Sequence, residues 1–345
     1  LRRCQMKAYV GIDLHSTNNY VGIIDQKDKR LFQKRLPNSL DNVLKALRPF
    51  KKQIEGIAVE STYNWYWLVD GLQEAGYNVH LANPSAIKQY EGLKYSDDKW
   101  DSYWLAHLLR LNILPVGYIY PKEQRAVRDL LRRRLMFVKQ RTAQILSLQS
   151  LIARNRGLNM PGSSIKRLRD DFIENLFESS HLVFTAKRNA ATIRFLSKII
   201  EEIEKEVRTQ VQLENEFQLL RTIPGIGNIL GLTIMMEVGT IDRFAKVGNY
   251  SSYCRCVESK KVSNKKKKGE NNKKNGNRYL GWAYVEAANY AQSLCPFAQK
   301  FFQRKMSKKS GIRAIAIKAL GNKLTKASYY ILRDQVPYDP KKLFH

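Results

Sequence analysis

Paired cysteines, clustered histidines and long apolar runs are all missing from this sequence of 345 residues. None of its four cysteines (Cys4, Cys254, Cys256 and Cys295) belongs to a CxxC pair, and the five histidines are too scattered to complete a zinc site. We therefore expect reduced thiols in a cytoplasmic protein. No apolar run reaches the roughly 18–20 residues that a membrane span needs. The first residues, LRRCQMKAYVGID, contain no signal-peptide core and leave Met6 open as the natural start.

Acidic residues are also scarce relative to basic ones. The chain has 60 lysines and arginines against 31 aspartates and glutamates, a formal net charge of +29. Solubility alone does not require such an imbalance, whereas binding to a polyanion explains it, because each neutralised phosphate releases counterions. No basic amphipathic segment stands out that would indicate an anionic membrane surface instead. The charge therefore favours nucleic acid as the partner and argues against a membrane.

Apolar residues, at 43%, are sufficient for folded cores, and the length predicts two or three domains. We expect an α/β domain at 7–114, a helical, coiled-coil dimerisation region at 122–220 and a mainly helical domain at 221–335. The fold class predicted is thus α/β followed by α.

Residues 7–113 alternate between strand and helix patterns. The predicted elements, in chain order, are antiparallel strands at 7–15, 19–25 and 30–36, a helix at 38–50 with Ser39 as N-cap, a strand at 54–60, a helix at 63–75, a strand at 78–82, and helices at 84–90 and 98–111. This is the order of the RNase H-like fold, in which the first and fourth strands lie side by side at the centre of the sheet. We therefore expect the ends of those two strands to be neighbours.

Single carboxylates stand at the ends of these central elements. Asp13 ends the first strand, Glu60 ends the fourth, and Asp98 and Asp101 begin the last helix on one helical face. Carboxylates gathered in this way repel one another and need a cation, and hard oxygen ligands select Mg²⁺ or Mn²⁺. The four residues together predict a metal site.

These residues also admit other interpretations. Asp13 is compatible with an ordinary strand followed by a turn, and Asp98 and Asp101 with the capping of a helix. Asp97 is an alternative ligand to Asp98 in a different helical register. His15 is close enough to Asp13 in sequence to assist it, or is a surface residue of the turn.

From Glu123 onward, apolar residues recur every three or four positions. The spacing predicts a long helix as far as residue 155, a break at 157–164, and further helix at 165–184 and 192–220. Two long antiparallel helices with an insertion suit a stalk or dimerisation arm. The run Arg132–Arg134 is either a solvated face or a nucleic-acid contact.

The segment RTIPGIG at 221–227 joins two predicted helices as a helix-hairpin-helix motif does. Its glycines permit close backbone approach, and amides at a helix N-terminus suit a phosphate; a plain turn is the alternative. The helix that follows, at 228–238, is apolar on nearly all sides and should lie in a core. A short helix or strand at 250–256, a lysine-rich loop, and helices at 278–292 and 301–332 complete the pattern.

The lysine-rich loop lies between ordered elements, which favours contact with phosphates over a merely solvated run. Its Asn/Lys/Gly tract at 271–277 is expected to be mobile. The residues expected to contact nucleic acid are Pro224, Gly225, Gly227, Lys265, Lys266, Lys267, Lys268, Lys273, Lys274 and Arg278.

Several of these segments together resemble one family. GID on the first strand, VEST on the fourth and SDDKWDSYWLA on the last helix resemble the RuvC-like half of the DEDD insertion-sequence transposases. RTIPGIG, FAKVGNYSSYCRC and SNKKKKGENNKKNGNRYLGWAYVEAAN resemble the C-terminal transposase domain of that family. The family includes the bridge-RNA-guided recombinases and, more distantly, the Piv-type invertases.

The resemblance implies that the four carboxylates are a DEDD set holding two Mg²⁺ (or Mn²⁺) ions. It also implies a serine nucleophile, which falls on Ser263 in VSNKKKKG, with Ser259 as the alternative. Lys265 stands where we expect a glycine after SN, which is a departure from the family pattern.

The function implied is transposition of a mobile element by DNA strand exchange through a phosphoserine–DNA intermediate. The implied partners are double-stranded donor and target DNA, a non-coding guide RNA and further copies of the chain in a dimer or tetramer. The implied location is the cytoplasm of a bacterium or archaeon, in association with the nucleoid. One alternative is a RuvC-like metal-dependent nuclease or Holliday-junction resolvase that uses water, and another is a non-catalytic nucleic-acid-binding protein.

Overall fold

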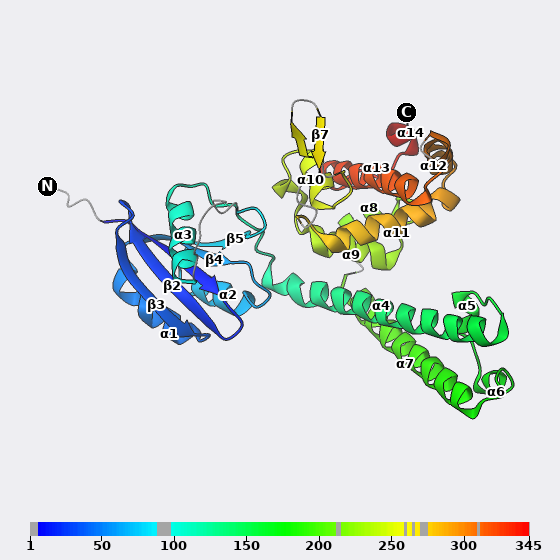
Figure 1. Cartoon of the computed structure of the whole chain (residues 1–345). Coiled ribbons are helices and arrows are strands. Elements are labelled where there is room, and N and C mark those ends of the chain that lie inside the picture. The colour runs from blue at the N-terminus through cyan, green and yellow to red at the C-terminus, as the bar shows by residue number, and fades with distance from the viewer. Residues whose placement is uncertain are drawn as a thin grey trace. The chain divides into compact units, whose positions relative to one another are not determined.

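The computed structural model describes residues 6–87, 98–211, 215–258, 261–263, 266–269, 275–308 and 311–344. The chain divides into two compact units, Leu1–Lys122 and Glu123–His345. In Figure 1 the first unit runs from blue to cyan and the second from green to red. No helix of the described residues is long and apolar enough to cross a membrane.

The first unit is built on a five-stranded sheet in the order β3-β2-β1-β4-β5. Its strands are β1 (Ala8–Leu14), β2 (Asn18–Asp25), β3 (Arg30–Pro37), β4 (Ile54–Glu60) and β5 (Val79–Ala82). β1 pairs antiparallel with β2 and parallel with β4. The predicted meander and the predicted central pair are therefore confirmed, and the arrangement is consistent with an RNase H-like fold.

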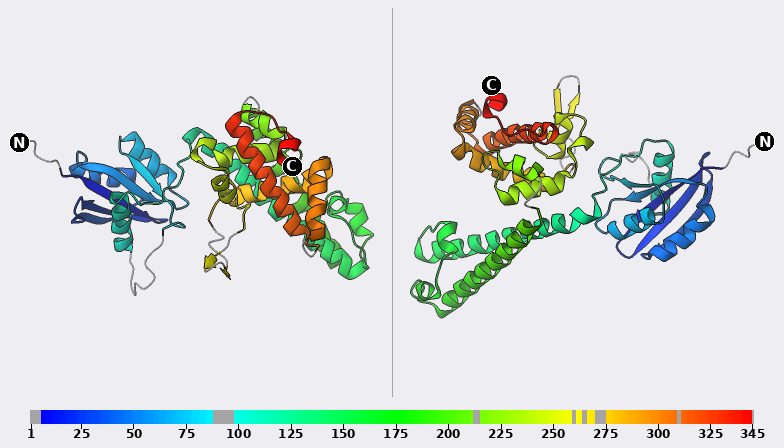
Figure 2. Two further views of the ribbon diagram at one scale, coloured as in Figure 1. Left: turned by 90° about the horizontal axis from the view of Figure 1, so that it is seen from above. Right: turned by 180° about the vertical axis from the view of Figure 1, so that it is seen from behind.

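Helices pack on both faces of this sheet, as Figures 1 and 2 show. α1 (Leu40–Leu47), which continues into a 3₁₀ turn (Arg48–Phe50), and α2 (Tyr66–Glu74) form one apolar core with Val10 and Ile12 of β1. α3 (Asp98–Arg110) packs on the opposite face, against β1, β2 and β4. A strand covered on both faces is apolar along its length, which explains the run that precedes Asp13.

Glycines on the α3 face of the sheet let α3 lie close to the strands. A Cβ atom added at Gly11 would lie 1.9 Å from the Ser102 carbonyl oxygen, and one added at Gly22 would lie 2.8 Å from Ser102 Oγ. A side chain at Gly11 would therefore push the backbone of α3 away from β1. The glycine of the GID segment thus has a packing reason to be there.

Two predicted elements of this unit need correction. α2 begins at Tyr66 rather than at residue 63. The predicted helix at 84–90 is wrong over its first part, because the bonds from Ala86 N to Asn83 O and from Ile87 N to Pro84 O close a turn without continuing as a helix. The rest of that prediction, 88–90, lies outside the described residues. Ser39 does take the N-cap position of α1, although its side chain makes no capping bond within the described part of the chain.

The second unit begins with an antiparallel arm of two long helices, α4 (Lys122–Arg156) and α7 (Ser180–Val211). Arg134 Nε donates to Glu204 Oε1 at 2.8 Å, and Arg141 donates to Ser197 at 3.1 Å, so the two helices are joined along their length. The predicted pair of long helices is confirmed. The predicted helix at 165–184 is wrong: α5 (Gly162–Ile165) and α6 (Asp170–Glu174) are short and separate, because Leu168 and Phe177 fold down into the core at the tip of the arm.

A helical bundle completes the second unit. Its elements are α8 (Asn215–Arg221), α9 (Asn228–Val238), a 3₁₀ turn (Ile241–Arg243), α10 (Val247–Tyr253), α11 (Arg278–Leu294), α12 (Pro296–Lys308), α13 (Arg313–Asp334) and α14 (Pro340–Phe344). α9 is buried in the bundle core, as predicted. The helix predicted at 301–332 is present as two helices, α12 and α13, and Gly311 takes a positive φ of 66° between them.

A two-stranded antiparallel ribbon, β6 (Lys261–Ser263) and β7 (Lys266–Gly269), lies where we expected a loop. Its lysine-rich residues show none of the apolar alternation by which a strand is usually recognised. The short element expected at 250–256 is the helix α10, which begins three residues earlier than predicted.

Candidate active site

The carboxyl ends of β1 and β4 place Asp13 and Glu60 at one edge of the sheet. Ile12 pairs with Val59 in the parallel ladder, so the next residue of each strand lies at the same level. Asp13 is 3% exposed, and Glu60 is half-buried. The two carboxylates, 47 positions apart in sequence, are therefore neighbours at one edge, as expected.

Both carboxylates face α3. Gly11 lies against α3, and because side chains alternate along a strand, Asp13 points to the same face. Ala58 packs with Leu105 of α3, which by the same alternation places Glu60 on this face. Both carboxylates therefore lie on the face of the sheet that α3 covers.

The direction of α3 brings its first turn to this edge. Ser102 lies against Gly11 near the end of β1, whereas Leu109 lies against Gly56 near the start of β4. The helix therefore runs antiparallel to both strands, with Asp98 and Asp101 at the end nearest the two strand carboxylates. Asp101 is half-buried, and the side chain of Asp98 lies outside the description. The structure thus places Asp13 and Glu60 at one edge of the sheet and directs the first turn of α3, with Asp98 and Asp101, toward that edge.

His15 contacts the most buried of these carboxylates. Its Nε2 lies 3.2 Å from Asp13 Oδ2, and the imidazole is 38% exposed. The carbonyl oxygen of His15 accepts bonds from Asn38 Nδ2 and from Asn64 Nδ2, each at 3.0 Å. These two asparagines hold the turn that follows Asp13. Sequence reasoning missed them, because neither stands in a recognisable motif.

The donor set suits a hard cation, since it consists of carboxylate oxygens beside one partly exposed imidazole. The described side chains alone hold no group of three that could bind a metal ion. That statement does not cover Asp98, the fourth predicted ligand, because its side chain is not described. Asp97 also lies outside the described residues. Metal binding at this edge therefore depends on the first turn of α3.

The predicted nucleophile is in the other unit. Ser263 ends β6, is exposed, and pairs across the ribbon with Lys266. The structure describes it as part of a defined ribbon and not of a loop, in a different unit from the carboxylates. Ser259, the alternative, lies outside the described residues.

The structure describes some of the residues that we predicted to contact nucleic acid. Lys266, Lys268 and Arg278 are exposed. Gly225 and Gly227 lie in the loop between α8 and α9, together with Pro224, and all three line a cavity. The predictions that lie outside the described side chains are Lys265, Lys267, Lys273 and Lys274.

A buried carboxylate that sequence reasoning missed lies at the base of the ribbon. Glu237 of α9 is 2% exposed and accepts bonds from Arg128 Nε at 3.0 Å, Arg132 Nη2 at 2.8 Å and Asn277 Nδ2 at 2.7 Å. Burial alone would raise the pKa of Glu237, but the bonds and charges of Arg132 and Arg128 hold the pKa below its ordinary value. The sequence offers one sign of this role: Glu237 is the single charged residue in the apolar run IMMEVG.

Asn277, which binds Glu237, lies between the ribbon β6–β7 and the first residue of α11. Its Oδ1 accepts from the backbone N–H groups of Tyr279 and Leu280, which caps α11. Arg255, on the other side of the ribbon in sequence, donates from Nε to the carbonyl oxygen of Gly276 at 3.0 Å. Arg255 and Gly276, which precede and follow the ribbon in the chain, are thus joined by a hydrogen bond. Asn277, the next residue, is joined through Glu237 to Arg128 of α4.

Two family models match this chain. A DEDD transposase model of the IS110 type, described as "Transposase", matches residues 10–154, which include all four predicted carboxylates. A second model, described as "Transposase IS116/IS110/IS902 family", matches residues 217–303, which include Ser263 and the α8–α9 loop.

Two curated proteins are also similar. One is a protein of Sinorhizobium fredii (strain NBRC 101917 / NGR234) named as transposase y4qE, 22% identical over 317 residues, which is 91% of this chain and 79% of the relative. The other is the transposase for insertion sequence element IS1111A of Coxiella burnetii (strain RSA 493 / Nine Mile phase I), 24% identical over 232 residues. That alignment covers 65% of this chain and 62% of the relative.

The sheet, its edge of carboxylates and these matches define a transposase of the DEDD class. More narrowly, the chain belongs to the IS110/IS116/IS902 family of transposases. Membership implies an enzyme that acts on DNA in transposition.

Proposed function

We propose that this transposase exchanges DNA strands by metal-assisted phosphoryl transfer at the edge formed by Asp13, Glu60, Asp98 and Asp101. The observation that carries the proposal is the register of β1 and β4, which sets Asp13 level with Glu60 on the face that receives the first turn of α3. When bound, two Mg²⁺ (or Mn²⁺) ions would neutralise these carboxylates and stabilise negative charge on the attacking and leaving oxygens.

The chain's own residues shape that site. Asp13 is nearly buried, so its charge is poorly solvated and favours a positive neighbour. His15 Nε2 lies 3.2 Å from one oxygen of Asp13, and the bonds from Asn38 and Asn64 to the His15 carbonyl fix the turn behind it. The carboxylate is thereby oriented before a substrate arrives.

Ser263 is proposed as the nucleophile. Its Oγ forms a bond to phosphorus while the bond from phosphorus to the leaving strand oxygen breaks. The hydroxyl proton passes to solvent, and the leaving oxygen takes up a proton to become a free hydroxyl. The phosphoserine–DNA bond retains the energy of the broken bond, so that strands can be rejoined without another energy source.

The Asp13→Asn variant tests the carboxylate half of this proposal. We expect strand cleavage to fall about a thousandfold, because the variant removes charge that holds the cation. The measurement is cleavage of DNA carrying the ends of the element, in Mg²⁺ and in Mn²⁺. Cleavage at the parent rate would remove the metal-site proposal. If cleavage is lost in Asp13→Asn but persists in Ser263→Ala, water is the nucleophile and a resolvase-like nuclease is supported.

We further propose a non-coding guide RNA as a partner, in keeping with the family resemblance and with a net charge of +29. Purified protein should then carry one discrete RNA species whose sequence pairs with donor and target DNA. The measurement is sequencing of the co-purified RNA. Recombination by protein freed of all RNA would contradict this partner.

A further inference from the structure

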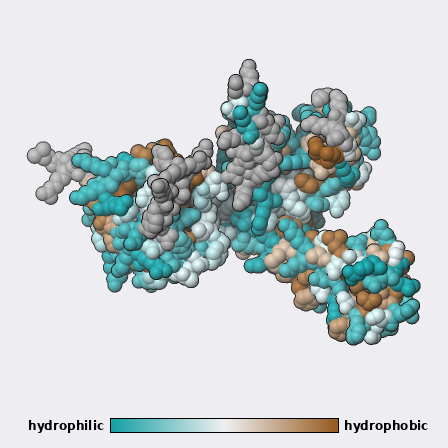
Figure 3. All heavy atoms as spheres, in the orientation of Figure 1, coloured by the Kyte–Doolittle hydropathy of each residue, from teal (hydrophilic) through white to brown (hydrophobic). Residues whose placement is uncertain are grey.

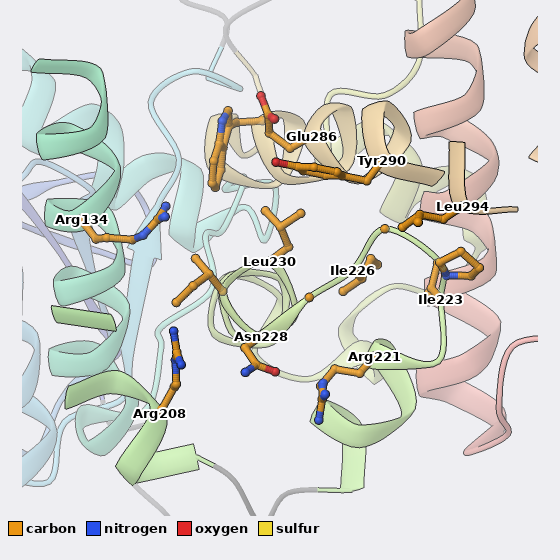
Figure 4. A pocket seen from close by; sticks show the side chains of 15 residues that line it. Arg134, Arg208, Arg221, Ile223, Ile226, Asn228, Leu230, Glu286, Tyr290 and Leu294 are labelled. Atoms are coloured by element: carbon orange, nitrogen blue, oxygen red, sulfur yellow. The ribbon is translucent and has the colours of Figure 1, made fainter. Parts of the chain in front are cut away.

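A cavity of about 640 Å³ opens in the second unit beside the loop between α8 and α9 (Figure 4). Three arginines line it from three helices, Arg134 on α4, Arg208 on α7 and Arg221 at the end of α8. α11 lines another side. The volume lies in the range of small-ligand sites in proteins.

The charge of the lining favours an anion. Arg134 and Arg208 share Glu204, at 2.8 Å and 3.4 Å, and Glu286 also lines the cavity. Three guanidinium groups therefore face two carboxylates. Arg221 is exposed, and its guanidinium lies 5.6 Å from the centre of the Phe217 ring. Exposed arginines of this kind can reach a phosphate without leaving a buried charge behind.

α11 adds aromatic side chains to the same space. Trp282, Glu286, Tyr290 and Leu294 recur every four residues and so form one stripe of the helix. Tyr290 is 57% exposed although it lines the cavity. In Figure 4 the side chains of Tyr290 and Glu286 lie across the cavity from Arg208. Trp282 is half-buried against the core, so Tyr290 is the ring that is open to a ligand. An exposed aromatic ring beside arginines is a combination by which proteins hold unpaired bases and their phosphates.

The two glycines of the loop differ in what they require. Gly225 has a φ of +91°, and an added Cβ atom would lie 2.3 Å from the Ala287 carbonyl oxygen, so the fold itself demands glycine there. Gly227 has an ordinary φ of −84°, and an added Cβ atom would meet nothing within 4 Å. Packing therefore gives no reason for glycine at 227, which borders the cavity and precedes the first turn of α9.

We propose that this cavity binds an unpaired nucleotide, with its phosphate against Arg221 and Arg208 and its base on Tyr290. The inference deepens the proposed function, because strand exchange and a guide RNA both present unpaired bases. Duplex DNA keeps its bases stacked and does not present one. The ligand chemistry, an unpaired base with a phosphodiester, is shared by single-stranded DNA and RNA.

Binding of a short fluorescent oligothymidylate and of the matching oligouridylate to the full chain tests the stacked base. Tyr290→Leu should weaken binding about fivefold or more, whereas Tyr290→Phe should keep it, because stacking needs the ring and not the hydroxyl. Tyr290 is exposed, so both variants should fold, which thermal unfolding checks. The two oligonucleotides together show whether DNA, RNA or both occupy the cavity.

Two further variants test the phosphate position and the space itself. Arg221→Gln should lower the slope of log affinity against log salt by about 0.7, the value for one phosphate contact on a single strand. Arg188→Gln is the matched control, because Arg188 is equally an exposed helix residue whose guanidinium lies 5.4 Å from the ring of a phenylalanine four residues earlier. Gly227→Gln should fold normally and weaken binding by filling the open space.

Equal binding by the parent, Tyr290→Leu and Gly227→Gln would overturn the proposal, as would a loss that Arg188→Gln shares in full. A strand carrying 5-iodouracil should also crosslink to the peptide that contains Tyr290, and crosslinks confined to the lysines of the ribbon would contradict it. The assay measures binding without cleavage. Loss of the nucleotide-binding proposal therefore leaves the strand-exchange proposal standing. If strand exchange is not observed, the binding result can still be interpreted.

Discussion

Glu237 shows how a single residue can join parts of the fold that are distant in sequence. It stands alone in an apolar stretch of α9 and is held by Arg128, Arg132 and Asn277. A buried carboxylate is tolerated only when cations and donors surround it in this way. Through Asn277 the contact reaches the root of the ribbon that carries Ser263.

The Glu237→Gln variant should lower the free energy of unfolding by about 3 kcal/mol, because the buried guanidinium of Arg128 and the half-buried one of Arg132 lose their counter-charge. The pKa of Glu237 is lowered by folding from its ordinary value of 4.5. The contribution is therefore fully present above that value and is lost as the pH falls through the folded pKa. The measurement is urea unfolding from neutral to acidic pH, where the parent should lose more stability than the variant.

The matched control for this prediction is Glu202→Gln. Glu202 is 62% exposed in its side chain and pairs only loosely with Lys198, at 4.0 Å, four residues earlier in α7. Its replacement should change stability by less than about 0.5 kcal/mol. Equal effects of the two substitutions would show that the Glu237 contacts do not hold the fold together.

At the scale of elements, the arm of α4 and α7 carries exposed apolar side chains. Phe184 and Phe195 are each 64% exposed and, being eleven residues apart, lie on one stripe of α7, while Leu146 of α4 is 60% exposed. Figure 3 shows apolar surface, in brown, on this part of the molecule. Exposed apolar residues of this size are typical of an interface.

We therefore predict that the arm joins copies of the chain. Phe184→Ser combined with Phe195→Ser should shift the protein toward the monomer, as measured by light scattering during gel filtration. Phe297→Ser, at a phenylalanine of α12 that is 41% exposed, is the control and should leave the mass unchanged. A double variant with the parent's mass would place the interface elsewhere.

The elements that could be predicted from the sequence are those whose cause is local. The apolar runs before Asp13 and Glu60 and the periodicity of α3 and α4 were visible in the chain. The order of these elements then placed the carboxylates together. What could not be predicted depends on partners far along the chain, such as the contact of Asn64 with the turn after Asp13, or that of Arg128 with Glu237, across 109 residues.

Two segments adopt a structure that their local composition does not predict. The lysine-rich residues of β6 and β7 indicate a loop that contacts phosphates, yet they pair as a ribbon. The helical pattern of 301–332 does not show that two helices share it, with Gly311 at a positive φ between them. Both departures lie in the second unit.

At the scale of the whole molecule, the proposed reaction needs both units. The carboxylates belong to Leu1–Lys122 and Ser263 to Glu123–His345. Two units that each hold part of a site allow chemistry only after assembly, within one chain or between copies. A net charge of +29 suits a chain that must hold nucleic acid while this site assembles.

The covalent protein–DNA adduct is the most direct test of this account. Parent protein, with its DNA and Mg²⁺, should form an adduct stable to denaturation, and mass spectrometry should locate the phosphodiester on Ser263. Ser263→Ala should form none, and Asp13→Asn should form it at a strongly reduced rate, since the serine and the carboxylates act on one phosphate. Cleavage by Ser263→Ala at the parent rate, with no adduct in either protein, would contradict the account.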